Sequence, residues 1–255
     1  MSWAMQTVSE IATSVPDLQG EWYLSFMQRL HGILQPATYF EVGTSTGDSL
    51  VVSQCPSIAV DPAFRLSAER VGPKPICAFY QMTSDAYFAA HSPSALFGRP
   101  IDLAFLDGLH LAEALLRDFI NTERHCKPNS VVMLHDCIPT DTYIAERVNS
   151  PERRESRSAH PGWWTGDVWK VLPILRRMRP DLSIHALDAS CTGLVMITNL
   201  DPGSTVLSDT YAASLREMRA MDLATYGLER FIAEQEIEST ASYQTFEDIS
   251  ARFWL

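Results

Sequence analysis

Two acids and two histidines stand at the ends of two predicted strands, where they could hold a metal ion or move a proton. Asp107 ends one apolar segment, His110 follows three residues later, and His135-Asp136 end a second apolar segment. Carboxylates at the ends of adjacent parallel strands can converge on one divalent cation and leave positions open for substrate oxygens. These residues predict a metal site of Asp107, His135 and Asp136. The alternative is that both acids only cap the segments that follow.

His110 is the predicted general base, with Asp107 as the second catalytic residue. An imidazole titrates near neutrality, and a place at the start of a helix disfavours its charged form. The alternative role for His110 is a surface residue that caps the turn. Mg²⁺ is the first expected metal, and one histidine with two carboxylates would also suit Mn²⁺ or Fe²⁺.

A glycine-containing turn, E-V-G-T-S-T-G-D, follows the first predicted strand. Gly43 and Gly47 allow a tight turn and a close approach of the backbone to a ligand. Their spacing is not the G-x-G-x-x-G of a dinucleotide fold, and no P-loop is present, so a pyrophosphate cofactor is disfavoured. Asp61 ends the next predicted strand, 20 residues after Glu41, and could bind ribose hydroxyls. Its alternative role is to cap a turn.

Alternating apolar and helical segments must position these residues. We expect strands at 37–42, 57–61, 76–81, 101–106, 131–135, 182–187 and 193–198, and helices at 18–34, 48–53, 84–91 (capped by Ser84 or Asp85), 110–126, 167–178 and through most of 205–255. This alternation predicts an α/β fold with a mostly parallel sheet covered on both faces. The last two strands are too close in sequence for a parallel crossover, so we expect an antiparallel edge hairpin.

Three motifs together resemble a known family. They are E-x-G-x-x-x-G at 41–47, F-L-D-G-L-H at 105–110, and K-P-N-S-V-V-M-L-H-D at 127–136. Over residues 36–200 the sequence resembles the class I S-adenosylmethionine (SAM)-dependent methyltransferases. Within them it is most similar to bacterial sugar and macrolide O-methyltransferases and cephalosporin-hydroxylase-like proteins. The resemblance implies a Rossmann-like sheet of seven strands and SAM as the cofactor.

The resemblance also implies roles for individual residues. The cofactor would be bound by Glu41, Gly43, Thr44, Ser45, Gly47, Asp61, Ser84, Asp85 and Asp107. Relatives use acids at the later strand ends for a divalent metal that binds the substrate hydroxyls. This chain departs from them, because His135 replaces the first acid of the usual pair and Cys137 stands where other branches carry Asn. A metal-independent enzyme that uses His110 alone is therefore an alternative.

An arginine-rich segment is expected to cover the acceptor. Residues 147–179 hold eight basic and three acidic residues, whereas the whole chain has a net charge of −11. We expect a lid at 138–170 whose arginines, Arg153 and Arg154 among them, favour an anionic small-molecule acceptor. The alternative is a solvated loop with Trp169 in the core. The expected organisation is one domain, 1–255, with a helical addition at 1–35, a core at 36–200 and a helical addition at 201–255.

Composition excludes several classes of function. The chain has 255 residues, with 31 acids against 20 bases, which argues against a nucleic-acid partner. Its five cysteines form no C-x-x-C pair, its first residues do not resemble a signal peptide, and no apolar run is long enough to span a membrane. These features predict a cytoplasmic protein with no membrane partner. The aromatic, acidic end is expected to pack on the domain or on a second subunit, so a homo-oligomer is a hypothesis.

The combined prediction is a SAM-dependent O-methyltransferase that acts on a hydroxyl of a small molecule, either a sugar or a natural product, with help from a divalent metal. One alternative is the metal-independent enzyme. Another is a SAM-binding partner subunit without catalysis. A nicotinamide oxidoreductase is disfavoured by the glycine spacing.

Overall fold

A computed structural model describes residues 13–253 of the chain, so the first twelve residues of the expected N-terminal addition lie outside it. Seven strands form one sheet in the order β3-β2-β1-β4-β5-β7-β6. They are β1 (Tyr39–Val42), β2 (Ser57–Val60), β3 (Cys77–Tyr80), β4 (Ile101–Leu106), β5 (Cys126–His135), β6 (Ser183–Leu187) and β7 (Leu194–Thr198). The first five are parallel, and β7 runs antiparallel to β5 and β6. The Rossmann-like sheet with an antiparallel edge hairpin is confirmed.

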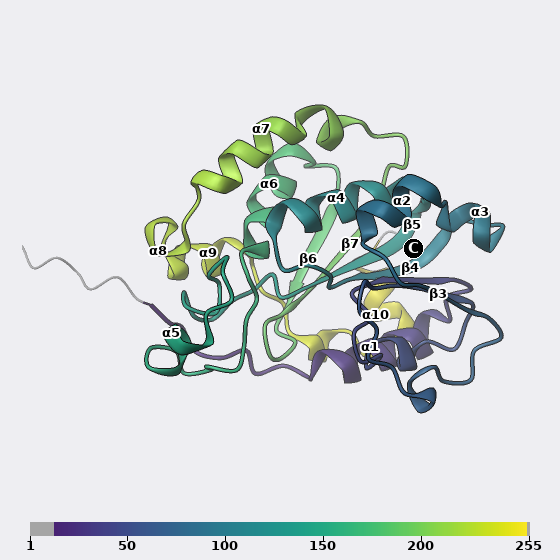
Figure 1. Cartoon of the computed structure of the whole chain (residues 1–255), viewed down its shortest axis with the longest axis horizontal. Helices are drawn as coiled ribbons and strands as arrows, with labels where there is room; N and C mark the ends of the chain where they lie inside the picture. The colour runs from purple at the N-terminus through teal and green to yellow at the C-terminus, as the bar shows by residue number, and fades with distance from the viewer. Residues whose placement is uncertain (1–12, 254–255) are drawn as a thin grey trace, which may run out of the picture.

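Helices cover both faces of this sheet (Figure 1). The α-helices are α1 (Tyr23–Leu34), α2 (Ser84–Ala90), α3 (Pro93–Phe97), α4 (Ala112–Glu123), α5 (Pro151–Glu155), α6 (Val171–Met178), α7 (Val206–Ala220), α8 (Leu223–Tyr226), α9 (Leu228–Glu234) and α10 (Phe246–Ser250). Short 3₁₀ turns are η1 (Leu50–Val52), η2 (Ala68–Arg70), η3 (Val168–Lys170) and η4 (Thr240–Ser242). In Figure 1, α2, α4, α6 and α7 lie on one side of the sheet, and α1 and α10 on the other.

Alternation along the strands divides the core into two layers. Phe40 and Val42 of β1 pack in the layer that contains α4 and α6, whereas Tyr39 packs in the layer that contains Phe26 of α1 and Ile249 of α10. Successive side chains of a strand point to opposite faces, so a strand covered on both faces is apolar throughout. The strand ends are the part of the sheet that remains free for polar side chains.

Several element boundaries differ from the sequence predictions. β5 begins at Cys126 rather than 131, because the predicted turn at 127–130 is an irregularity within the strand, where the pairing with β4 shifts register. The helix expected at 48–53 is only the 3₁₀ turn η1. Thr83 caps α2, rather than Ser84 or Asp85, and its hydroxyl accepts a hydrogen bond from the Ala86 amide. Pro173 lies in the first turn of α6, where a missing N–H costs little.

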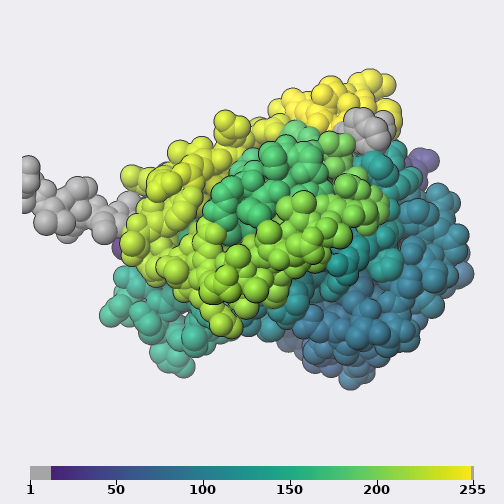
Figure 2. All heavy atoms as spheres, turned by 90° about the horizontal axis from the view of Figure 1, so that it is seen from above, coloured from purple at the N-terminus to yellow at the C-terminus, as the bar shows by residue number. Residues whose placement is uncertain are grey.

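The C-terminal segment packs on the domain. Packing on the domain was one expectation from the sequence, and packing on a second subunit was the other. Figure 2 shows α7 running across the outer face of the helical layer. Farther along, Glu238 pairs with the edge strand β6, because its amide donates to the Ala186 carbonyl at 2.8 Å and its carbonyl accepts from Asp188. This pairing covers a strand edge that would otherwise be open. Among the described residues, no helix is both long and apolar enough to cross a membrane.

Candidate cofactor pocket and metal site

A pocket of about 570 Å³ opens at the carboxyl ends of β1, β2 and β4. The strand order reverses between β1 and β4, and ligands of open α/β sheets bind outside the strand ends at such a point. Six of the predicted cofactor residues line the pocket: Gly43, Ser45, Asp61, Ser84, Asp85 and Asp107.

Gly43 lets the loop after β1 lie directly against the loop after β4. Its φ is +90°, and a Cβ at this position would lie 2.0 Å from the backbone oxygen of Asp107. A side chain would therefore clash with backbone as well as strain the turn.

Asp61 both caps a turn and faces the pocket. Its two carboxylate oxygens accept hydrogen bonds from the amides of Ser45 at 2.8 Å and Ala63 at 2.7 Å. Each oxygen keeps a further lone pair for a hydroxyl donor, so the two roles predicted for Asp61 are compatible.

Three other predicted residues lie beneath the pocket rather than along it. Glu41 is fully buried and accepts a hydrogen bond from the Tyr39 hydroxyl at 2.6 Å, and burial raises the pKa of Glu41. Thr44 is also buried, and Gly47 adopts a φ of +83° beside Leu66. These residues belong to the turn after β1 and do not line the pocket.

Asp85 is already held by a cation. Arg117 of α4 donates two hydrogen bonds to it, at 2.8 and 2.7 Å. This fork fixes the wall of the pocket between α2 and α4, and it leaves Asp85 less available to a ligand than Asp61.

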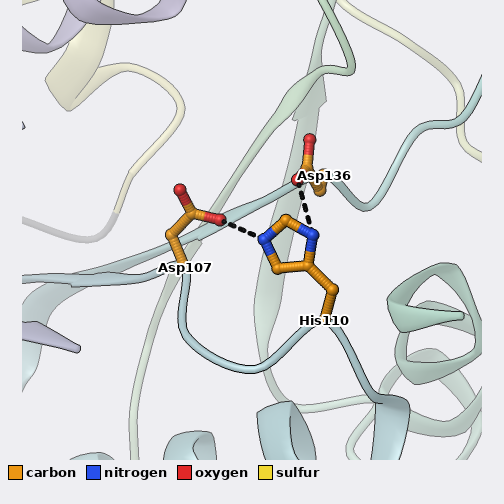
Figure 3. Close-up of side chains that lie close together, drawn as sticks. All are labelled: Asp107, His110 and Asp136. Atoms are coloured by element: carbon orange, nitrogen blue, oxygen red, sulfur yellow. Dashed lines mark ion pairs between the residues drawn. The ribbon is translucent and has the colours of Figure 1, made fainter. Parts of the chain in front are cut away.

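Beside the pocket, the His110 ring lies between two carboxylates (Figure 3). Its Nε2 is 3.4 Å from Oδ1 of Asp107, and its Nδ1 is 3.4 Å from Oδ2 of Asp136. One ligand atom from each of the three residues lies within 4.8 Å of the others, a spacing that suits one metal ion. His110 thus takes the place in the cluster that was predicted for His135.

His135 lies behind this cluster. Its Nδ1 is 3.4 Å from the second oxygen of Asp107, and its ring packs on Tyr23 with centroids 4.1 Å apart. Burial alone would lower the pKa of His135, but the carboxylates of Asp136 and Asp107 raise it. Asp107 therefore contacts both imidazoles, one through each oxygen.

The surroundings of His110 favour its charged form in the metal-free protein, in contrast to the effect expected of a helix N-terminus. Burial lowers the pKa of His110, but the neighbouring carboxylates of Asp107 and Asp136 outweigh this and raise it to about 9. A general base must be neutral to accept a proton, so the role of His110 as the base stays a prediction.

Three residues of the site were not predicted. The Trp164 ring of the lid stacks on His110 with centroids 5.1 Å apart, and its carbonyl accepts a hydrogen bond from Nδ1 at 2.8 Å. The Thr192 hydroxyl donates to Asp136. Tyr23 precedes the family-like region, so no motif marks it.

The arginines of the lid pair with other groups of the protein. Arg147 pairs with Glu113 at 2.5 Å and with Asp167 at 3.1 Å. Arg154, expected to meet an acceptor, is buried and donates to the Pro161 carbonyl and to Asn149, and Arg153 pairs with Glu146. Trp169 is 1% exposed, as the alternative interpretation of the lid predicted.

A buried acid of α4 makes a testable prediction about stability. Asp118 is 2% exposed, and its Oδ1 has no hydrogen-bond partner among the described residues. Burial and the nearby charge of Asp85 raise the pKa of Asp118 from 3.8 to about 7. The native state therefore binds a proton that the unfolded state releases above pH 4, so this group makes stability fall as pH rises from about 4 to 7.

Replacing Asp118 by asparagine should remove this cost. At about 1.4 kcal/mol per pKa unit, the ionised acid lowers stability by up to about 4 kcal/mol above pH 7. We expect Asp118→Asn to be more stable than the wild type at pH 8, by about 1–2 kcal/mol, and to show no gain at pH 4. Urea denaturation at the two pH values measures the change in stability. An equal gain in stability at pH 4 and pH 8 would contradict the conclusion that Asp118 is buried in its protonated form.

Comparison with known proteins places the site in context. Residues 40–137, from β1 to the residue after Asp136, match a family model described as a methyltransferase domain. Among curated proteins, none matches the chain at a significant level. Among solved structures, the O-methyltransferase from Bacillus cereus in complex with SAH is 15% identical, with a TM-score of 0.47, and the match covers 74% of this chain and 84% of that one. The O-methyltransferase TomG from Streptomyces achromogenes, involved in tomaymycin synthesis and solved with SAM, is 14% identical, with a TM-score of 0.49 and coverage of 72% and 82%.

Proposed function

We propose that the chain is a SAM-dependent O-methyltransferase acting on a hydroxyl of a small molecule, a sugar or a natural product, with help from a divalent metal. The match of residues 40–137 to a family model described as a methyltransferase domain supports this proposal. The observation that carries this proposal is that the pocket and the charged cluster share two residues. Asp107 and His110 line the pocket and also form the cluster with Asp136. A methyl donor in the pocket would therefore lie next to the groups that handle the acceptor.

The cofactor would occupy the pocket at the ends of β1, β2 and β4. Asp61 would accept hydrogen bonds from the ribose hydroxyls, since its carboxylate already faces the pocket. Gly43 would keep the loops after β1 and β4 in close contact at the edge of the pocket, because a side chain there would clash with the Asp107 backbone. A sulfonium methyl is already activated, so the protein mainly has to align it with the acceptor oxygen.

The residues of the cluster fit a divalent metal. Oδ1 of Asp107 is buried and has no hydrogen-bond partner among the described residues, and Asp136 offers a second oxygen whose orientation Thr192 fixes. A bound divalent ion would supply Lewis acidity that lowers the pKa of the acceptor hydroxyl. Asp107 and Asp136 would hold it, and Trp164 would limit the access of water by covering the His110 ring.

The metal-independent alternative is less favoured because of the charge of His110. In the absence of a cation, Asp107 and Asp136 raise the pKa of His110 to about 9. A rate that depends on neutral His110 alone would then rise with pH up to about 9. Activity that survives EDTA and follows this profile would support the alternative. SAM binding without turnover on any hydroxylated acceptor would support a non-catalytic subunit.

Asp61→Asn tests the cofactor site. An amide has one acceptor oxygen where the carboxylate has two, so it cannot serve the backbone and the ribose equally. We expect the Kd for SAM to rise about 10- to 100-fold, equivalent to about 1.4–2.8 kcal/mol. Isothermal titration calorimetry with SAM measures this effect.

Asp85→Ala is the matched control, because Asp85 lines the same pocket but already binds Arg117. Its Kd for SAM should change less than about threefold. A lower melting temperature of Asp61→Asn with an unchanged Kd would mean that Asp61 only caps the turn, and a wild type that does not bind SAM would contradict the proposed function.

A further inference from the structure

We propose that His110 is a nitrogen ligand of the metal rather than the base, and that the site therefore selects a first-row transition metal, such as Fe²⁺ or Mn²⁺, over Mg²⁺. This inference rests on the proposed function, since it concerns the same metal site. It assigns the two histidines of the cluster different tasks: His110 binds the ion, and His135 positions Asp107.

The hydrogen bond to the lid orients His110 as a ligand. Nδ1 lies 2.8 Å from the Trp164 carbonyl oxygen. A carbonyl only accepts, so Nδ1 carries the hydrogen and the lone pair of the neutral ring is on Nε2. Nε2 is the nitrogen that faces Oδ1 of Asp107 at 3.4 Å. Metal-binding histidines characteristically donate their other N–H to a backbone carbonyl or carboxylate in this way.

The backbone on both sides of His110 is fixed. A Cβ on Gly166, which has a φ of +60°, would lie 1.8 Å from the His110 carbonyl oxygen, so lid and loop are in direct contact. The Asp167 amide donates to the same oxygen at 3.3 Å, and the Asp167 carboxylate caps α4 by accepting from the Ala112 amide at 2.9 Å. The imidazole is thus held in one position, as a metal ligand requires.

His135 is less suited to the ligand role than His110, because neither of its ring nitrogens has a hydrogen-bond partner among the described residues that would orient the ring. The ring packs on Tyr23 and Phe105, with centroids 4.1 and 5.9 Å away, and it is 9% exposed. Its Nδ1 lies 3.4 Å from Oδ2 of Asp107, the oxygen that does not face His110, and 3.5 Å from Oδ1 of Asp136. A group that contacts the far oxygen of a ligand carboxylate supports that carboxylate.

The ligand chemistry then decides the class of metal. Mg²⁺ prefers oxygen ligands in a strict octahedron, whereas imidazole suits iron and the other transition metals. Two carboxylates and one imidazole leave open positions, as the binding of an acceptor oxygen needs. Exchange of one oxygen ligand for nitrogen is therefore expected to lower the affinity for Mg²⁺ relative to Mn²⁺.

Mn²⁺ is the probe for this inference, used on the full chain after removal of metals with a chelator. Pulsed electron paramagnetic resonance of the Mn²⁺-loaded protein should show nitrogen coupling, and incorporation of ¹⁵N-histidine should change that coupling. Calorimetry should give a Kd for Mn²⁺ at least about 10-fold lower than that for Mg²⁺. Absence of nitrogen coupling in the wild type would overturn the inference without the need for any variant.

Variants then identify the histidine. His110→Gln should lose the nitrogen coupling and bind Mn²⁺ about 10- to 100-fold more weakly, whereas His135→Gln should keep the coupling. His160→Gln, a lid histidine that pairs with Asp17 at 2.7 Å, should behave as the wild type. Coupling that persists in His110→Gln and disappears in His135→Gln would overturn the assignment.

SAM titration of the same samples separates the two hypotheses. SAM binding by a wild type whose Mn²⁺ spectrum shows no nitrogen coupling would refute only the assignment of His110. If SAM does not bind, the proposed function fails whatever the Mn²⁺ spectra show.

Discussion

Replacing Asp107 by asparagine is expected to lower kcat for methyl transfer about 10³-fold, because it removes a negative charge that lines the pocket and contacts both His110 and His135. Its Oδ1 faces His110, its Oδ2 faces His135, and both contacts are 3.4 Å. Burial would raise the pKa of Asp107, but the two histidines hold it well below the usual range, so the group is a carboxylate at any working pH. A bound metal supplies several kcal/mol of charge stabilisation, and about 1.4 kcal/mol corresponds to a factor of ten in rate.

The rate of S-adenosylhomocysteine release with an active hydroxylated acceptor measures this effect, and Mn²⁺ calorimetry should show the parallel loss of metal affinity. The control is Asp102→Asn, the same substitution on the same strand. Asp102 lies near the opposite end of β4 and pairs with Lys127 at 2.7 Å, so its loss should change stability but not kcat. An Asp107→Asn variant with wild-type turnover would exclude Asp107 from the reaction.

The architecture could be predicted because it depends on patterns that are local in the sequence. Strands buried on both faces, such as 101–106, are mostly apolar, and the bounds predicted for this strand match those of β4. The edge hairpin followed from the short connection between 182–187 and 193–198, which cannot hold a parallel crossover. The resemblance to methyltransferases was predicted from three motifs, and all three lie within residues 40–137, which match a family model described as a methyltransferase domain.

The metal site was only partly predictable, because strand ends reveal which residues meet but not how their side chains turn. His135 and Asp136 are adjacent in sequence, yet Asp136 adopts a φ of +60°, and His135 packs into the layer beneath the sheet. His110, four residues past the end of β4, enters the space between the acids instead. Its charge state could not be predicted either, since it depends on two carboxylates whose distance from the ring is a tertiary property.

Long-range contacts determine which acids the basic residues of the segment 147–179 meet. The excess of basic residues at 147–179 suggested an anionic acceptor, but sequence cannot show which acids stand opposite them. Arg147 and Lys170 both pair with Asp167, and Arg177 pairs with Glu217 of α7. The positive charge of this segment is therefore used largely within the protein, and an anionic acceptor remains a prediction.

Arg179 is the most consequential of these arginines for stability, and its loss should cost about 3–5 kcal/mol. Its guanidinium is 2% exposed and forms two hydrogen bonds to Glu123 of α4, at 2.8 and 2.9 Å. Arg179→Met would leave the Glu123 carboxylate buried without its cation. Because the Arg179 side chain joins the end of α6 to the end of α4, we expect a melting temperature roughly 10 °C lower for a chain of this size.

A double variant distinguishes an unpaired charge from lost packing. Arg179→Met with Glu123→Leu removes both ions, and replacement of a buried pair by apolar groups is often close to neutral, so it should recover most of the loss. Arg177→Met is the control: its partner Glu217 is 42% exposed, and an exposed pair contributes at most about 1 kcal/mol. Urea denaturation of the wild type and these three variants measures the losses. Equal losses in the single and double variants would show that Arg179 stabilises the junction by packing, because a buried charge left without its partner would make the single variant the less stable of the two.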